Sequence, residues 1–171
     1  SGTVAEKEGG EYFGPVYLWG SKDPEDVSYT CLAVDEDVTL KGFAGIFVGA
    51  NENAAYGVQV EMNGAIETIP DTRGDTGYAI YVNGGVTGIS DNCPKILVGQ
   101  NARIDSAGLG LYLAGYADTV IGGQAEINSV DGIEIRAGKL LIQEDAVIRA
   151  TNTKTDVEGN PSGSTTLGSA I

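Results

Sequence analysis

The residues that offer chemistry in this chain are aromatic rings and carboxylates, because the sequence contains no histidine. Without an imidazole, the chain has no histidine base for proton transfer and no histidine ligand for a metal. Tyr17, Phe47, Tyr81 and Tyr112 each stand in the middle of a short segment with alternating apolar residues. Rings in such a shared position bind sugar rings or apolar partner surfaces, so these four residues are the candidate ligand-binding residues.

Carboxylates are abundant, with 24 Asp and Glu against 10 Lys and Arg. The segments 23–26 and 35–37 are rich in oxygen ligands for Ca²⁺, but neither has a recognised ligand spacing such as that of an EF-hand loop. Glu134, with Asp131 and Glu126 near it in sequence, is the best candidate for a pair of catalytic acids. Solvated surface acids are the commoner explanation of such residues. We therefore assign no catalytic residue, no metal site and no cofactor, with Ca²⁺ as the one metal left open.

The net charge of −14 limits the classes of partner. It repels phosphate backbones and anionic lipid headgroups, so we expect no nucleic-acid partner. No run of about 18 apolar residues is present, and no basic segment precedes an apolar one. We therefore expect no membrane insertion in this segment.

The two cysteines, Cys31 and Cys93, lie too far apart in sequence to form a metal-binding or redox pair of the Cys-x-x-Cys kind. We expect two buried thiols, and one disulfide is the alternative.

The elements that must position the aromatic residues are short strands. Apolar residues alternate with polar ones, and 26 glycines are too many for long helices. A seven-residue pattern, with Val or Ile first, Asn, Gln or Asp fourth and Ile or Leu last, begins at Val34, Val60, Val98, Ile121 and Ile142. A short alternating strand precedes each copy and begins at Pro15, Gly45, Ala79, Gly110 and Gly132. The period is about 30 residues and shortens toward the C-terminus, which indicates a repeat architecture.

Repeat units of this length cannot bury their apolar face alone and must stack, which predicts a parallel β-solenoid. We expect one buried column of Val60, Val98, Ile121 and Ile142, and a second of Ile66, Ile104, Ile127 and Ile148. The four candidate aromatics, followed by Glu134, would then form an external strip with a spacing of about 4.8 Å. The alternative is that these rings only stabilise the sheet, or lie under the chain's own loops.

We expect a single domain over residues 1–171, within a longer parent protein. Residues 1–13 are predicted to be an N-terminal cap, 14–150 the repeated coils, and 151–171 a weaker final coil or a cap. The polar segments 20–26, 49–56, 70–76 and 83–94 are predicted loops, which in solenoids often collect on one side and build the binding surface.

The repeats, together with the stretch LAVDEDVTLKG at Leu32–Gly42, resemble the right-handed parallel β-helix of pectin-lyase-like proteins. In particular, they resemble the Gly-rich solenoid segments of bacterial cell-surface and secreted proteins. The resemblance covers about residues 15–148 and rests on periodicity. It implies an all-β, right-handed parallel β-helix of about five coils and an extracellular or cell-surface location.

The resemblance also implies two classes of function. The first, which we expect, is a non-catalytic module that is adhesive, glycan-binding or structural, with a glycan or a host or cell-surface protein as its partner. The alternative is a polysaccharide lyase or glycoside hydrolase domain that acts on an acidic polysaccharide. The family's hydrolase pattern of paired Asp residues with a histidine and an Arg-x-Lys segment is missing from this sequence.

Overall fold

The structure is a computed structural model that describes residues 2–5, 16–26, 29–49, 55–71, 76–83 and 90–151. In these ranges the backbone forms strands, turns and bends, as the alternation predicts. None of the described segments is a helix long and apolar enough to cross a membrane. The strands are β1 (Gly2–Ala5), β2 (Val16–Trp19), β3 (Thr30–Val34), β4 (Val38–Gly42), β5 (Ile46–Gly49), β6 (Val58–Met62), β7 (Ala65–Thr68), β8 (Tyr78–Val82), β9 (Lys95–Val98), β10 (Arg103–Ser106), β11 (Leu109–Leu113), β12 (Asp118–Ile121), β13 (Glu126–Ser129), β14 (Ile133–Ile135), β15 (Lys139–Ile142) and β16 (Val147–Ala150).

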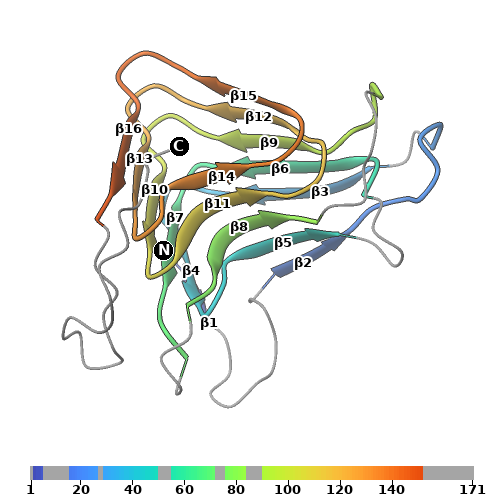
Figure 1. Cartoon of the computed structure of the whole chain (residues 1–171). Helices are drawn as coiled ribbons and strands as arrows, with labels where there is room; N and C mark the ends of the chain where they lie inside the picture. Colours follow the sequence, from blue (N-terminus) through green and yellow to red (C-terminus); the bar gives the residue numbers. More distant parts are fainter. Residues whose placement is uncertain are drawn as a thin grey trace.

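The strands form three sheets, and every pairing within them is parallel. Sheet I has the order β1-β4-β7-β10-β13-β16, sheet II β2-β5-β8-β11-β14, and sheet III β3-β6-β9-β12-β15. Each coil of the chain runs through sheet II, then sheet III, then sheet I, so the sheets form the three walls of a stack (Figure 1). The predicted all-β parallel β-helix of about five coils is therefore confirmed.

The core consists of aliphatic columns that run through the stack. The alignment of Ile66, Ile104, Ile127 and Ile148 is confirmed, with Ile148 only partly buried, and Leu40 extends the column by one coil. On sheet II, the inward residues Val16, Ile46, Ile80, Leu111 and Ile133 are aligned in the same way. Burial of each such residue contributes about 1.5–3 kcal/mol relative to exposure, which holds the coils in register.

The other predicted column is wrong at one position. Val98, Ile121 and Ile142 are aligned, but the residue paired with Val98 is Met62 and not Val60. Val60 is buried on the same face of sheet III. The predicted face is therefore correct, and the register is wrong by two residues.

The length of one corner explains this difference. Residues 63–64 join β6 to β7, whereas residues 99–102 join β9 to β10 in the next coil. Gly64 is required in the shorter corner, because a Cβ there would collide with the backbone oxygens of Asp35 and Val38. The longer corners have Asn101, Gln124 and Asp145 in the left-handed region, with φ of 68°, 65° and 67°. Asn and Asp tolerate that conformation better than most residues, which is consistent with their recurrence in the sequence pattern.

The predicted cap and final coil fall mostly outside the described residues. Within residues 1–13, the described part is β1, which pairs in parallel with β4 at the end of sheet I. In the segment 151–171, only Thr151 is described. Both assignments therefore stay predictions.

Buried hydroxyl groups in the core differ in their hydrogen bonding. Thr68 lies at the corner between sheets I and II, where its Oγ1 is 2.9 Å from Ser106 Oγ and accepts a hydrogen bond from the Ala107 amide at 2.9 Å. Thr119 faces the core from β12 and is 2% exposed. Its Oγ1 has no hydrogen-bond partner in the described part of the chain. A buried hydroxyl without a partner costs about 1–3 kcal/mol.

The same substitution should therefore have opposite effects at these two positions. We expect Thr119→Val to raise the free energy of unfolding by about 1 kcal/mol, because it removes an unsatisfied hydroxyl and keeps the shape. We expect Thr68→Val to lower it by about 1–3 kcal/mol, because the Ala107 amide and Ser106 lose a partner. Urea unfolding monitored by circular dichroism measures both, and equal shifts would contradict the assigned hydrogen bonds.

Candidate functional site

The four candidate aromatics form one row on the outer face of sheet II. Tyr17 pairs with Phe47, Phe47 with Tyr81, and Tyr81 with Tyr112 in the parallel register. The ring centroids of these neighbours are 5.4, 5.0 and 5.2 Å apart. Each of the four residues is partly exposed. The predicted row is therefore present on an accessible face, and its role in binding stays a prediction.

Trp19 extends the row at its first strand and was missed in the sequence. Its ring stacks on that of Tyr17, with centroids 6.2 Å apart and an interplanar angle of 11°. The residue is 51% exposed. Strict alternation places Trp19 on the same face as Tyr17, so the strand pattern itself contained this signal. Opposite Trp19 stands Gly49, where a Cβ would collide with the Phe47 ring, so the glycine leaves room for that ring.

Tyr78 is the second ring that sequence reasoning missed. Its centroid lies 5.1 Å from that of Tyr81 and 5.3 Å from that of Tyr112. Alternation places Tyr78 and Tyr81 on opposite faces, because they are three residues apart. Ala79 and Ile80, which lie between the two tyrosines, are both buried. This interruption of the alternation bends β8, so that both tyrosines point outward. A bend of this kind has no clear signature in the sequence.

The row ends in an ion pair. The guanidinium of Arg136 lies over the Tyr112 ring, 5.0 Å from its centroid. The Arg136 Nε donates a hydrogen bond of 2.7 Å to Glu134 Oε1, and Glu134 occupies the fifth position of the row. This hydrogen bond and the charge of Glu134 raise the pKa of Arg136, which keeps the guanidinium charged.

The two ends of the row therefore differ in what they expose. The Tyr112 ring is nearly parallel to those of Tyr81 and Tyr78, with interplanar angles of 15° and 21°. Rings at these distances are offset-stacked, so Tyr78 and Tyr81 cover one side of the Tyr112 ring. The guanidinium of Arg136 also lies over the Tyr112 ring. The rings at this end therefore pack mainly on one another, whereas Trp19 at the other end is 51% exposed.

The hydroxyl of Tyr81 acts as a hydrogen-bond donor in this row. It donates to Asn83 Oδ1 at 3.3 Å. Burial raises the pKa of Tyr81, and the neighbouring Tyr112 and Tyr78 raise it further. The phenol is therefore protonated at neutral pH and does not serve as a base.

Two of the three candidate acids, Glu134 and Glu126, are not brought together. Glu134 lies on the outer face of sheet II against Arg136, with the 2.7 Å contact described above. Glu126 belongs to β13 of sheet I, where its Oε2 lies 3.7 Å from Arg149 Nη1. Each acid faces an arginine on a different sheet, so these two carboxylates do not form a catalytic pair.

The two acidic segments lie in different local structures. Asp35, Glu36 and Asp37 line an open hollow together with Asn63, at the corner between sheets III and I. Asp23 accepts a hydrogen bond of 2.9 Å from the Glu25 amide and so closes a turn. Within the described ranges, no three His, Cys, Asp or Glu side chains are grouped to hold a metal ion.

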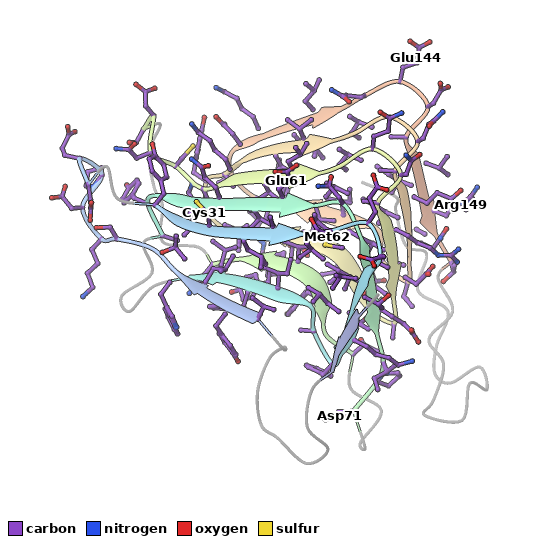
Figure 2. All side chains as sticks on the ribbon, turned by 180° about the vertical axis from the view of Figure 1, so that it is seen from behind. Cys31, Glu61, Met62, Asp71, Glu144 and Arg149 are labelled. Carbon is purple, nitrogen blue, oxygen red and sulfur yellow. The ribbon has the colours of Figure 1, made fainter. Side chains whose placement is uncertain are left out.

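The prediction of two buried thiols is wrong for Cys31. Cys93 is buried, but Cys31 is exposed, and the two are not joined by a disulfide. Cys31 lies on β3, on the side of the molecule that Figure 2 shows. Burial and the neighbouring Asp118 raise the pKa of Cys93, so its thiol is poorly reactive.

The described parts of three predicted loops lie at one corner of the stack. The segments 20–26, 49–56 and 83–94 all lead from sheet II to sheet III. Their described residues are joined by backbone hydrogen bonds between Ser21 and Tyr56, of 2.9 and 3.0 Å. The segment 70–76 instead leads from sheet I to sheet II. The loop cluster therefore adjoins the row of rings at Trp19, where β2 ends.

No protein-family model, no curated protein and no solved structure matches this chain. The parallel β-helix is shown by the sheets, and membership of the pectin-lyase-like family is not. The function is therefore argued from the aromatic face of sheet II.

The two ends of the row should respond differently to truncation. We expect Tyr112→Ala to lower the free energy of unfolding by about 1–2 kcal/mol, because it removes ring stacking on both neighbours. Trp19→Ala should change it by less than about 0.5 kcal/mol, because Trp19 lies at the edge and is half exposed. Urea denaturation of both variants measures the difference, and an equal loss would show that Trp19 is also structural.

The exposure of the two cysteines predicts a thiol count. We expect a water-soluble disulfide reagent such as DTNB to modify one thiol rapidly in the folded protein and two after unfolding. Cys31→Ser should abolish the rapid reaction, whereas Cys93→Ser should leave it unchanged. Rapid modification of both thiols in the folded state would contradict the burial of Cys93.

Proposed function

We propose that this chain is a non-catalytic binding module of a secreted or cell-surface protein, and that the outer face of sheet II binds glycans. The observation that carries the proposal is the aromatic surface formed by the exposed Trp19 and the partly exposed Tyr17 and Phe47. Aromatic rings offer rigid apolar surface at a low entropic cost, and sugar rings present apolar C–H faces to them.

The stacked sheet supports this surface in a way that suits a polymer. The strands that bear the rings are fixed by backbone pairing and by the aliphatic columns beneath them. The spacing between neighbouring rings, 5.0 to 5.4 Å, repeats along the axis of the stack. An extended glycan that lies along this axis would meet Trp19 and Tyr17 on β2 and then Phe47 on β5 without any rearrangement of the protein.

A glycan fits this face better than a protein partner does. Stable protein interfaces need a broad apolar centre that buries on the order of 800 Å² on each side. The row on sheet II is narrow, and its polar end is closed by Glu134 and Arg136. The separation of Glu126 from Glu134 supports a binding role over a hydrolytic one.

Truncation of the exposed ring should weaken binding. We expect Trp19→Ala to reduce the affinity for a bound glycan by about 10-fold, which corresponds to about 1.4 kcal/mol. Affinity electrophoresis on a panel of polysaccharides, followed by calorimetry on the best ligand, measures this change. Leu141→Ala is the matched control, since Leu141 is 57% exposed but lies on sheet III.

The same panel, incubated with and without Ca²⁺, also tests for depolymerisation through reducing ends and unsaturated products. We expect no products. An affinity equally reduced by Leu141→Ala, or the absence of binding to every polysaccharide, would overturn the proposal.

A further inference from the structure

The charged residues near the exposed Trp19 ring bear on whether neutral or acidic glycans can bind there. The loop that follows Trp19 carries Asp23, Glu25 and Asp26 against the single cation Lys22. The loop is held in place, because Asn92 Nδ2 donates a hydrogen bond of 2.8 Å to the Pro24 carbonyl. Trp19 is therefore followed in the chain by a loop in which carboxylates outnumber cations.

The cations of the described residues are mostly placed away from this surface. Among these described cations, Arg136 lies on the outer face of sheet II. It forms an ion pair with Glu134 at the far end of the row. Sheet I and sheet III hold most of the others, namely Lys41, Arg103 and Arg149 on sheet I and Lys95 and Lys139 on sheet III. The guanidinium of Arg136 thus meets an anionic sugar only in competition with Glu134.

Together with the proposed glycan-binding function, on which this inference rests, these observations indicate which charge a bound glycan should carry. A uronate or a sulfate ester at Trp19 would be repelled by the loop carboxylates and by the net charge of −14. An uncharged sugar carries no charge for those carboxylates to repel. We propose that the aromatic face binds uncharged glycans and that the loop after Trp19 excludes acidic ones.

Matched polymers test this selectivity with the full chain. Hydroxyethylcellulose and carboxymethylcellulose share a backbone and differ in charge, as do desulfated and native carrageenan. At low ionic strength we expect the anionic member of a bound pair to bind at least 10-fold more weakly than the neutral one. The difference should shrink as salt rises, because exposed charges are screened beyond about 10 Å at 0.1 M.

A charge reversal in the loop identifies the source of the selectivity. We expect Glu25→Lys to strengthen binding of the anionic member several-fold and to leave the neutral member nearly unchanged. Glu144→Lys is the matched control, since Glu144 is also exposed but lies at the corner after β15 (Figure 2). Unchanged melting temperatures of both variants show that the fold is kept.

The outcomes separate this inference from the proposed function. Binding of anionic polymers through Trp19 with an affinity equal to that of the neutral ones would overturn the uncharged-ligand inference and leave the glycan-binding function in place. An equal effect of Glu25→Lys and Glu144→Lys would overturn the role of the loop. Failure of every neutral and anionic polymer to bind would overturn the function itself.

Discussion

The stacking of inward aliphatic residues from coil to coil is the constraint on which the rest of the structure depends. Residues such as Ile46, Ile80 and Leu111 lose contact with water only when a neighbouring coil lies in register on each side. Because side chains alternate along a strand, the same register fixes the outward residues. Tyr81 therefore lies beside Tyr112 as a direct result of the alignment of Ile80 with Leu111.

The same register produces a different kind of row on sheet I. There Asn128 links charged neighbours, since its amide donates to Asp105 at 3.1 Å and its carbonyl oxygen accepts from Arg149 at 3.1 Å. Lys41 and Glu67 form an ion pair of 2.6 Å in the same sheet. Such exposed pairs contribute little stability and keep this wall well hydrated. The outer faces of sheets I and II therefore differ in character, since one is polar and the other is aromatic.

Particular residues show how far the sequence predicts this arrangement. The register of Tyr17, Phe47, Tyr81 and Tyr112 was predictable, because the inward residues beside them repeat on each strand of sheet II. Val60 was assigned to the wrong column because an ungapped pattern assumes equal corners, and the close contact that requires Gly64 is visible only in three dimensions. Trp19 follows from alternation, whereas Tyr78 depends on a bend in β8.

The position of a ring in the stack, more than its residue type, decides what the ring does. Tyr112 lies between strands on both sides and is covered by neighbouring rings and by Arg136, so its apolar faces are already used. Trp19 lies on β2, the terminal strand of sheet II among the described strands, and has a ring neighbour from one other strand. The acidic loop follows Trp19 directly in the chain, because β2 ends at that residue. Under the proposed function, affinity from the ring and exclusion of negative charge by the loop would therefore act on the same ligand.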